Sequence, residues 1–478
     1  MNQGAPGRAL VIGYGLTGRA ATTWLGAHGW SVTVIDDNPA AVPEHPVSGH
    51  TGPTHAAPTI ELAPSPGRAA ELARQADLVV PSPGVPVSHP ALAAAEAAGV
   101  DVRSEIELAW AELAEQRTRG GPRPADHLVA ITGTNGKTTV TGLVAAMLTS
   151  SGVKAVAAGN VGYPLLQAVA GLGRDGGTVV VAEVSSFQLH YTHHFRPDTS
   201  SWLNFAPDHL DWHPTLDHYA RAKGRIWAHQ VPGSTVVVNA DDPTVMAAAA
   251  DVPAAVEVVT FGRASRAGHD RQPTWRTTPE GIEGPAGFVL KAVELPRALP
   301  HDLANTAAAL AVALGAGATP EGSVEAARHT AAPPHRVQWV GEAGGVAWYD
   351  DSKATTPASV HAAVQGFRSV VLIAGGRNKG LDLSVLAETV PPVSAVVAIG
   401  ESSAEVAAAF AGRVPVRTAT TMSEAVEIAA GVARPGDTVL LSPGCASFDW
   451  YKSYAERGEH FASLVQAKLR EVVQPCQP

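Results

Sequence analysis

The sequence predicts an α/β protein built from three domains in series. Short apolar runs alternate with alanine-rich helical stretches almost throughout, a pattern typical of parallel sheets covered by helices. The chain has 478 residues, too many for one ordinary core, and about 150 residues per domain gives roughly three domains. Two polar or proline-rich segments, 117–126 and 331–336, separate three groups of expected strands. We place the domains at residues 1–105, 106–332 and 333–478.

The expected strands follow the apolar runs in order. Those of the first domain fall at 8–13, 31–36 and 76–84, with a short one near 101. Those of the second domain fall at 128–133, 178–186, 199–205 and 234–242. The third domain begins with a hairpin at 337–351 and continues with strands at 369–376, 394–400 and 437–444. The sequence contains no internal repeat, so we expect three separate α/β units.

Composition and charge narrow the classes of function. The net charge of −10 argues against a nucleic-acid partner, which normally leaves a basic footprint. Two cysteines, Cys445 and Cys476, are too few for a disulfide framework and are typical of a reducing compartment. The sequence has no signal-peptide pattern, and no apolar run approaches the roughly 18 residues of a membrane span. We therefore expect a cytoplasmic protein with no nucleic-acid or membrane partner.

A glycine-rich turn follows the first expected strand. GYGLTG places Gly13, Gly15 and Gly18 at the spacing G-x-G-x-x-G, and Asp36 ends the next strand. Such glycines let a pyrophosphate approach the start of a helix, while the acidic residue can accept a ribose hydroxyl. The motif indicates a Rossmann-like N-terminal domain. It leaves two ligand classes open, NAD(P) and a nucleotide-sugar diphosphate.

A second glycine-rich loop, ITGTNGKTT (131–139), opens the central domain. Gly133 and Gly136 leave backbone N–H groups free to point at oxyanions. Lys137 supplies a mobile cation, and Thr138 carries a hydroxyl suited to Mg²⁺. The standard P-loop has one more glycine, at the position of Ile131, but a plain turn would not need Gly-Lys-Thr. We interpret the loop as an ATP site in a mononucleotide-binding domain of the P-loop type.

ATP requires a metal, because Mg²⁺ bridges phosphate oxygens and prefers oxygen ligands. Glu183 follows an apolar strand of the same domain, and the segment DHLDWH adds Asp208, His209, Asp211 and His213. A single acid at such a place is usually a cap or a surface residue, but together these side chains favour a metal site. Lys223 lies in an amphipathic helical stretch, where its own surroundings indicate a solvated surface lysine.

Three loops of the C-terminal domain carry polar side chains just after strands. They contain Asp351, Ser352, Lys353 and Thr355, then Lys379, then Ser442 and Ser447. Loops at strand ends form the ligand-binding rim of open α/β folds, and two lysines with several hydroxyls suit an anionic substrate. We expect Cys445 to be a small buried filler, because no basic residue adjoins it in the sequence.

With these motifs in order, the chain resembles the Mur ligases of peptidoglycan synthesis from about residue 8 to about residue 465. The matching motifs are GYGLTG, SPGVP, ITGTNGKTT, GNVG, EVSSFQL, DHLDWH, AKGRI, NADDP, HDLAN, PPHR, DDSKAT, GGRNKG and SPGCASFD. Asn135 stands where the L-alanine-adding branch usually has histidine, and the Asp-Asn-Pro-Arg motif of the diaminopimelate-adding branch is missing from the C-terminal domain. GYGLTG and SPGCASFDWYKSY favour the branch that adds D-glutamate.

The resemblance implies an ATP-dependent amide ligase with a Rossmann-like C-terminal domain. It would add D-glutamate to UDP-N-acetylmuramoyl-L-alanine through an acyl phosphate and release ADP and phosphate. We expect a monomer that uses ATP and two Mg²⁺ ions. Two alternatives are an NAD(P)-linked dehydrogenase using GYGLTG and a nucleotide-switched binding protein without ligase chemistry.

The resemblance also implies roles for individual residues. The UDP substrate would meet Gly15, Leu16, Thr17, Asp36, Asp37, Gly84 and Asn160. ATP would meet Gly133, Thr134, Asn135, Gly136, Lys137, Thr138, Thr139, Asn305, Arg336 and Asp351. D-Glutamate would meet Lys353, Thr355, Lys379, Ser447, Phe448 and Tyr454. Thr138 and Glu183 would hold one metal ion and His209 the second, and Lys223 would be a carbamylated metal ligand. The catalytic residues would be Lys137, His209 and Lys223.

One position departs from the family pattern. The family usually has His-Asn-x-x-Asn where adenine is contacted, and this chain has His301-Asp302-Leu303-Ala304-Asn305. A carboxylate accepts hydrogen bonds but lacks the donor of an amide. The sequence therefore predicts a rearranged or weaker adenine contact at Asp302.

Overall fold

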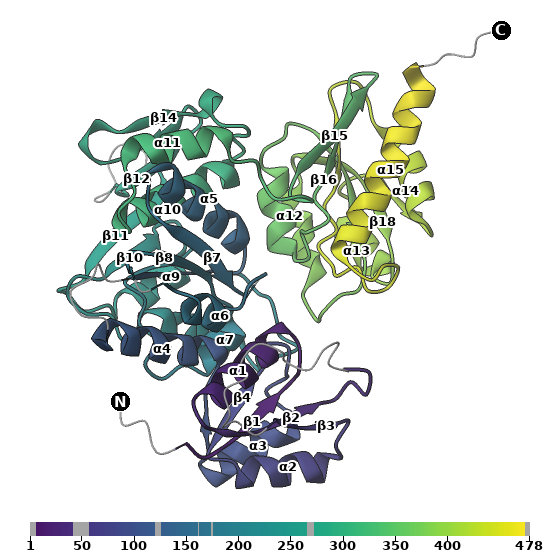
Figure 1. The fold of residues 1–478 in the computed structure, drawn as a ribbon. Coiled ribbons are helices and arrows are strands. Elements are labelled where there is room, and N and C mark those ends of the chain that lie inside the picture. Colours follow the sequence, from purple (N-terminus) through teal and green to yellow (C-terminus); the bar gives the residue numbers. More distant parts are fainter. Residues whose placement is uncertain are drawn as a thin grey trace.

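The computed structural model describes residues 6–41, 57–119, 126–160, 162–173, 175–264 and 272–473. It contains three sheets, one in each predicted domain, and helices cover them (Figure 1). The predicted fold class, three α/β domains in series, is confirmed. The boundaries that we placed at 105/106 and 332/333 stay a prediction.

The first sheet is parallel and has the strand order β3-β2-β1-β4-β5. Its strands are β1 (Arg8–Ile12), β2 (Ser31–Asp36), β3 (Thr59–Leu62), β4 (Leu78–Pro81) and β5 (Asp101–Val102). Its helices are α1 (Leu16–Ala27), α2 (Pro66–Gln75) and α3 (Pro90–Ala98). Because β2, β1 and β4 are parallel neighbours, the loops that follow them meet at one edge.

The second sheet has the order β14-β13-β12-β11-β10-β9-β6-β8-β7, and among its described strands only the β12–β13 and β13–β14 pairs are antiparallel. Its strands are β6 (His127–Thr132), β7 (Ala155–Gly159), β8 (Val179–Glu183), β9 (Thr199–Trp202), β10 (Thr235–Asn239), β11 (Glu257–Arg263), β12 (Trp275–Thr278), β13 (Gly281–Glu283) and β14 (Val289–Lys291). Its helices are α4 (Glu105–Arg119), α5 (Lys137–Ser150), α6 (Leu165–Ala170), α7 (Ser186–His190), α8 (Leu216–Gly224), α9 (Pro243–Ala249), α10 (Pro300–Gly315) and α11 (Pro320–His329).

The third sheet has the order β15-β16-β20-β17-β18-β19 and is parallel except for the β15–β16 hairpin. Its strands are β15 (Gln338–Ala343), β16 (Val346–Asp350), β17 (Val370–Gly375), β18 (Val393–Ile399), β19 (Val416–Ala419) and β20 (Thr438–Leu441). Its helices are α12 (Pro357–Val364), α13 (Ser403–Phe410), α14 (Met422–Val432) and α15 (Tyr454–Val473). Short 3₁₀ turns at 225–227, 285–287, 292–294 and 383–389 complete the described chain.

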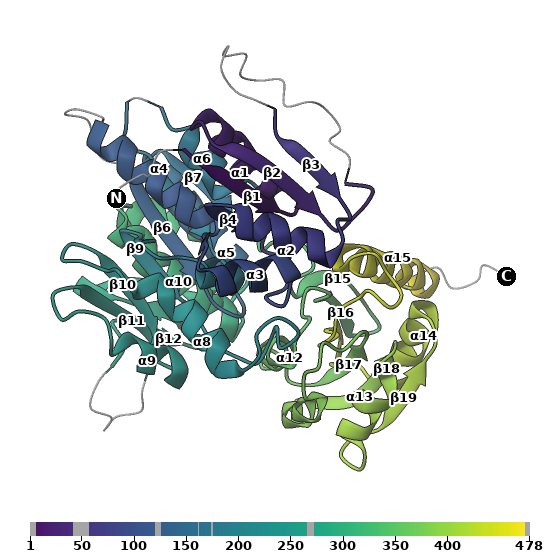
Figure 2. The same cartoon turned by 90° about the horizontal axis from the view of Figure 1, so that it is seen from below.

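Strand residues alternate between two apolar layers, as expected for sheets covered on both faces. In β6, Leu128 and Ala130 join one buried cluster, whereas Val129 and Ile131 join another that contains α5 and α10. The cluster around Leu128 extends into the first domain through α1, α4 and α6. The first two domains therefore share one continuous core, in which α1 packs against α4 and α6, and Figures 1 and 2 show α1 beside α6. The third domain has two clusters of its own.

All the strands expected from the sequence are present, but several others were not expected. The unexpected strands lie in segments to which we assigned no strand; they are β3, β7, β11, β19 and the group β12–β14. β3, β13 and β14 have only three or four residues each, so they carry little periodic signal. Within the described ranges, no helix is both long and apolar enough to cross a membrane.

Candidate active site

The phosphate loop joins β6 to α5 and is held in a fixed shape. Gly136 has a φ of +84°, and a Cβ there would lie 2.5 Å from Asn305 Oδ1, so glycine is required. Asn204 holds the loop tip: its Oδ1 accepts from Asn135 N at 2.8 Å, and its Nδ2 donates to Asn135 O at 3.1 Å. α5 begins at Lys137, so the unpaired N–H groups of its first turn adjoin the loop.

Two lysines meet at one carbonyl of this loop. Lys137 Nζ donates to Gly133 O at 2.8 Å and to Thr134 O at 3.0 Å. Lys223 Nζ, from α8, also donates to Gly133 O at 2.8 Å and lies 3.4 Å from Thr132 Oγ1. The interpretation of Lys223 as a solvated surface lysine is wrong, because the residue is only 1% exposed.

Burial lowers the pKa of both amines, and a neighbouring cation adds to each shift: Arg336 for Lys137, and Lys137 for Lys223. The pKa of Lys223 is held well below its ordinary value. The carboxylates of Glu183 and Asp208 act in the opposite direction on both lysines. Lys223 is therefore the residue of this pair that more readily becomes a neutral, nucleophilic amine.

Glu183 ends β8 with one oxygen held and the other free of donors. Asn160 Nδ2 donates to Glu183 Oε1 at 3.2 Å. Glu183 Oε2 is buried and has no hydrogen-bond partner among the described residues. A buried carboxylate oxygen without a donor is costly unless a cation meets it, so the site fits Mg²⁺. Thr138, in the first turn of α5, lines a pocket beside the loop.

His209 lies in the loop between β9 and α8. Its backbone takes a φ of +54°, and its N–H donates to Asp208 Oδ1 at 2.8 Å. Its Nε2 is 3.3 Å from Asp208 Oδ2, and Phe187 packs edge-on against the ring at 4.7 Å. Burial lowers the pKa of His209, whereas Asp208 raises it. A neutral imidazole has the free lone pair that a metal requires, so His209 suits a ligand role.

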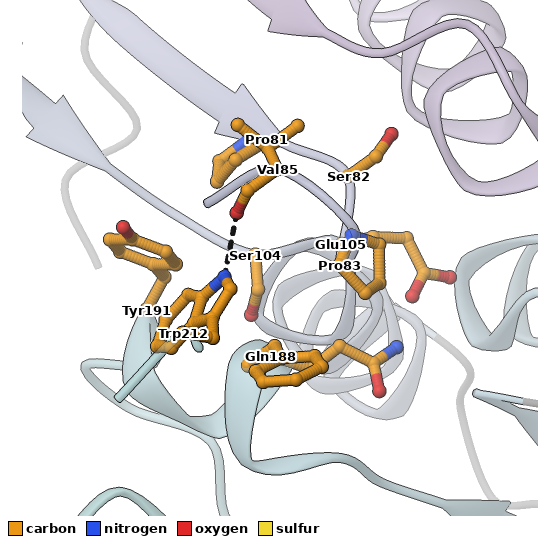
Figure 3. A pocket seen from close by; sticks show the side chains of 10 residues that line it. Pro81, Ser82, Pro83, Val85, Ser104, Glu105, Gln188, Tyr191 and Trp212 are labelled. Carbon is orange, nitrogen blue, oxygen red and sulfur yellow. Dashed lines mark hydrogen bonds between the residues drawn. The ribbon is translucent and has the colours of Figure 1, made fainter. Parts of the chain in front are cut away.

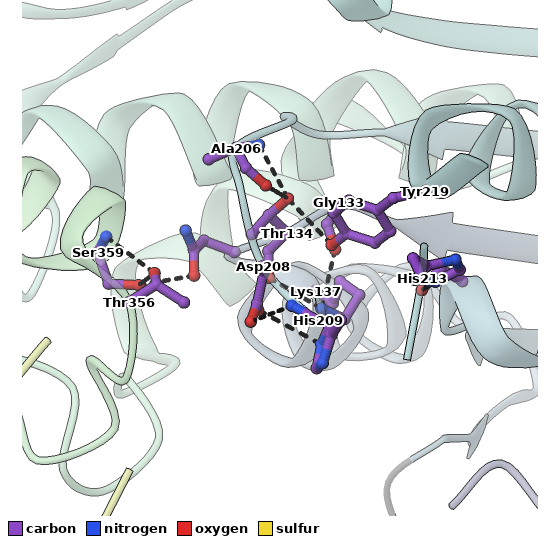
Figure 4. A network of polar contacts seen from close by, with 12 residues as sticks. Gly133, Thr134, Lys137, Ala206, Asp208, His209, His213, Tyr219, Thr356 and Ser359 are labelled. Carbon is purple, nitrogen blue, oxygen red and sulfur yellow. Dashed lines mark hydrogen bonds and ion pairs between the residues drawn. The ribbon is translucent and has the colours of Figure 1, made fainter. Parts of the chain in front are cut away.

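A polar network connects the phosphate loop with its surroundings (Figure 4). Thr134 Oγ1 accepts from Ala206 N at 3.0 Å and lies 3.2 Å from the Tyr219 hydroxyl. From α12 of the third domain, Ser359 Oγ donates to Asn135 Oδ1 at 2.8 Å. The loop tip is thus held by Asn204 of its own domain and by Ser359 of the C-terminal domain.

The residues predicted for the UDP substrate lie mostly at one edge of the first sheet. Gly15, Leu16 and Thr17 follow β1, Asp36 and Asp37 end and follow β2, and Gly84 follows β4. The Leu16 side chain is 68% exposed, and no atom lies within 4 Å of a Cβ built on Gly84. A Cβ on Gly18 would lie 1.8 Å from Gly13 O, so the close turn requires glycine. This edge is open to a ligand.

The two predicted acids at this edge do different things. Asp36 Oδ2 accepts from Tyr14 N at 2.6 Å, and its Oδ1 accepts from Asn38 N at 2.8 Å. Asp36 therefore shapes the glycine-rich turn from within. The Asp37 side chain is 72% exposed, and its Oδ2 lies 3.5 Å from His89 Nε2. Asp37 is the acid that faces outward.

The first domain is also fixed to the loop that carries His209. Trp212 Nε1 donates to Val85 O at 2.7 Å, across a small pocket lined by both domains (Figure 3). Phe187 packs against Trp212 with 4.8 Å between the ring centres. The edge of the first sheet is therefore connected to the loop of the candidate metal site by the Trp212–Val85 hydrogen bond.

The residues predicted for the amino acid surround the ends of β16, β17 and β20, which are neighbours in the third sheet. They are Lys353, Thr355, Lys379, Ser447, Phe448 and Tyr454. Lys353 Nζ lies 4.0 Å from the centre of the Tyr454 ring, a cation–π contact. Burial lowers the pKa of Lys353 to about 8, and Arg336 and Lys137 add to the shift. Phe448 is 59% exposed, whereas Ser447 is buried.

The segment between α11 and β15 carries Arg336 into the site. Asp351 Oδ1 accepts from Val337 N at 3.2 Å, and Asp351 Oδ2 accepts from Ser442 Oγ at 2.8 Å. Burial raises the pKa of Asp351 to about 7. The charge of Arg336 interacts with Asp351 and with Glu183 of the central domain. Arg336 therefore lies where the central and C-terminal domains meet.

Cations gather at this junction although the net charge of the chain is −10. Repulsion from Arg336, Lys137 and Lys379 contributes to the lowered pKa of Lys353. Lys379 and Lys137 also lower the pKa of His209. Mutual repulsion of this kind is relieved when anions bind, so the arrangement suits phosphates and carboxylates.

Five contributors to the site were not predicted: Asn204, Tyr219, Trp212, Arg297 and Ser359. Asn204 follows β9 at the same sheet edge as the phosphate loop, so its position at a strand end was an available signal. Ser359 and Trp212 act across domain boundaries, which the sequence does not reveal. Cys445 is 1% exposed, as expected for a buried filler.

Family models match three successive parts of the chain. They are described as a Mur ligase MurD-like N-terminal domain at 7–104, a Mur ligase middle domain at 131–313, and a Mur ligase glutamate ligase domain at 335–445. The UDP-N-acetylmuramoylalanine–D-glutamate ligase of Frankia casuarinae is 40% identical over 472 residues, covering 96% of this chain and 94% of the relative. The enzyme of the same name from Pelotomaculum thermopropionicum is 37% identical over 462 residues, covering 96% and 97%.

Solved structures share the fold at low identity. MurF from Acinetobacter baumannii superposes with a TM-score of 0.58 at 18% identity, covering 98% of this chain and 91% of that chain. The MurF ligase of Thermotoga maritima in complex with ADP also has a TM-score of 0.58, at 17% identity, covering 98% and 96%. At this identity the likeness extends to the fold alone.

Proposed function

The chain belongs to the Mur ligase family, and from that premise we propose that it adds D-glutamate to UDP-N-acetylmuramoyl-L-alanine in an ATP-dependent amide ligation. The observation that carries the proposal is the junction of three anion sites. The phosphate loop with Lys137 adjoins the cations Arg336 and Lys353 of the C-terminal domain, and Trp212 ties the first-domain edge to the same region. An NAD(P)-linked dehydrogenase would have no use for the phosphate loop or the C-terminal lysines.

The reaction proceeds in two steps. A carboxylate oxygen of the UDP substrate forms a bond to the γ-phosphorus of ATP, and the bond to the β–γ bridging oxygen breaks, releasing ADP. The neutral amine of D-glutamate then attacks the acyl phosphate, loses a proton and displaces phosphate. Lys137 stabilises the charge that develops during phosphoryl transfer, and Arg336 orients the nucleotide from the C-terminal side. Domain closure around the substrates would exclude water.

The residues present fit two Mg²⁺ ions. Thr138 and Glu183, with its unpartnered Oε2, would hold one ion, and His209 the other. When bound, Mg²⁺ would neutralise phosphate charge during transfer. Lys223 would complete the metal site as a carbamate, formed by addition of its amine to CO₂ with loss of a proton.

The proposal assigns each substrate to the residues expected from the sequence. The UDP substrate would bind Gly15, Leu16, Thr17, Asp36, Asp37, Gly84 and Asn160. ATP would bind residues 133–139 with Asn305, Arg336 and Asp351. D-Glutamate would bind Lys353, Thr355, Lys379, Ser447, Phe448 and Tyr454. The proposal includes a monomeric, cytoplasmic enzyme that acts without nucleic acid or a membrane.

Omission of each substrate in turn tests the function. With ATP and Mg²⁺, we expect sustained phosphate release only when both UDP-N-acetylmuramoyl-L-alanine and D-glutamate are present. Phosphate leaves only when the amine of D-glutamate attacks the acyl phosphate. Phosphate release is followed continuously, and the product is identified by mass. Equal turnover without the amino acid would contradict ligation, and turnover with ATP alone would instead favour a nucleotide-switched protein.

The pKa of Lys353 predicts how amino-acid binding depends on pH. An ammonium with a pKa of about 8 is charged below that pH and neutral above it. Affinity for a dicarboxylate should therefore be constant below about pH 8 and fall by up to about tenfold per pH unit above it. The inhibition constant of glutarate, which has no amine to titrate, measures this.

A Lys353→Arg variant is the control for that pH profile. Its guanidinium stays charged, so the decline above about pH 8 should disappear even if the absolute affinity changes. The same decline in the variant would assign the titration to another group.

A further inference from the structure

Asp302, at the start of α10, has both carboxylate oxygens engaged inside the protein. Arg297 Nε lies 2.6 Å from Asp302 Oδ2, and Arg297 Nη2 lies 2.6 Å from Asp302 Oδ1. Leu299 N donates to Oδ2 as well, at 3.1 Å. The Asp302 side chain is only 11% exposed. A bidentate, largely buried pair of this kind is a strong and directional contact.

The other edge of the same guanidinium holds the connection to the C-terminal domain. Arg297 Nη1 donates to the carbonyl oxygens of Arg336 and Val337, the latter at 2.7 Å. Asp302 fixes the orientation of Arg297, and Arg297 in turn fixes the two carbonyl groups. Direct hydrogen bonds therefore connect the Asp302 carboxylate, through one guanidinium group, to the backbone at 336–337.

The backbone held in this way is strained. His335 has a φ of +61° and Val337 a φ of +48°, and a β-branched residue rarely adopts that conformation. Such strain persists only where the surroundings over-determine it. Here Asp351 accepts from Val337 N on one side, while Arg297 donates to Val337 O on the other. Arg336 lies between the two strained residues.

We propose that Asp302 is a positioning residue for the nucleotide: through Arg297 it fixes the backbone at 336–337 and so aims the Arg336 side chain at ATP. An asparagine at 302 is neutral and has only one acceptor oxygen, so it could not form the same bidentate pair. Asp302 and Arg297 also line the pocket that contains Thr138 and Asn305. The inference rests on the proposed function for the identity of the nucleotide.

The test measures nucleotide affinity directly, by calorimetry with a non-hydrolysable ATP analogue and Mg²⁺. We expect Asp302→Asn to weaken binding about tenfold, as for the loss of a charge-assisted hydrogen bond. In an Arg336→Ala background, Asp302→Asn should add little further loss, because the effect passes through Arg336. Full additivity of the two changes, or unchanged affinity in Asp302→Asn, would overturn the proposal.

Two further measurements distinguish this positioning role from a direct contact with adenine and from a loss of folding. Purine riboside triphosphate lacks the amino group of adenine. If Asp302 contacted that group, Asp302→Asn would change the ratio of the affinities for ATP and purine riboside triphosphate. We expect this ratio to stay the same, and a changed ratio would overturn the proposal. Arg297→Lys should also weaken nucleotide binding, and this variant tests the proposal if Asp302→Asn is unstable. Normal nucleotide binding by Arg297→Lys would contradict the role of Arg297 in holding the backbone at 336–337.

Glu283→Gln is the matched control, because it breaks an exposed ion pair with Arg276 in the same domain. It should leave nucleotide affinity unchanged. These binding measurements remain informative even if the wild-type chain shows no phosphate release dependent on D-glutamate, which would contradict the proposed function alone.

Discussion

Lys137→Ala is expected to suppress acyl-phosphate formation almost completely and to leave binding of the UDP substrate nearly intact. Lys137 belongs to the phosphate loop, and its Nζ already lies within 3.0 Å of two loop carbonyls, Gly133 O and Thr134 O. The first-domain edge is built by β1, β2 and β4 and does not include Lys137. Loss of a positioned cation at a developing negative charge should reduce the rate by about 10³-fold.

The acyl phosphate can be trapped with hydroxylamine in the absence of D-glutamate, and UDP-substrate binding can be followed by calorimetry. Lys154→Ala is the matched control, because Lys154 is an exposed lysine of the same domain. It should have full activity. If Lys137→Ala instead lost affinity for the UDP substrate, the loop would have to shape the site of the first domain.

The fold was predictable because its signals are local. Apolar runs such as Leu128–Ile131 place alternate residues in two different clusters, and that is the pattern of a strand buried on both faces. The strands that were missed lack this signal: β3 is half-exposed, and β13 and β14 have three residues each. The order of the strands in each sheet could not be predicted from the sequence, because it depends on how the helical connections cross over the sheet.

Without the family resemblance, the candidate site was predictable only where its residues follow strands. Glu183 and Asp351 stand at strand ends, so their convergence with the loops beside them follows from parallel sheet geometry. The partners that hold these groups in place come from far along the chain. Ser359 reaches Asn135 across 224 positions, and no local pattern indicates that contact.

Asp302 shows a different limit. The sequence identified it as a departure from the family pattern, and the rearranged or weaker adenine contact that it predicts there stays a prediction. Its partner Arg297 is only five positions away, but Pro300 begins the helix between them, so helical spacing does not predict the pair. The contact to the carbonyls of Arg336 and Val337 is visible only in three dimensions.

Lys223 could not be assigned from its own surroundings, since a lysine on an amphipathic helix is usually solvated. Its burial arises because α8 packs against the loop after β6, some 90 positions earlier in the chain. There burial and the charge of Lys137 hold the pKa of Lys223 well below its ordinary value, which favours the neutral form of the amine, the form that adds to CO₂. A carbamate at Lys223 would be an anion, and it would replace the repulsion from Lys137 with attraction.

Lys223→Ala is therefore expected to reduce activity by about 10²-fold or more, the usual cost of losing part of a metal site. Small carboxylates such as acetate or formate should restore part of the activity, because they can occupy the place of the carbamate. Arg221→Ala is the matched control: Arg221 lies on the same helix, its side chain is 71% exposed, and its loss should have little effect. In wild-type protein, ¹³CO₂ should give a carbamate signal that is absent from the variant. Full activity of Lys223→Ala in CO₂-depleted buffer would remove Lys223 from the metal site, and its burial would then serve only to hold the Gly133 carbonyl.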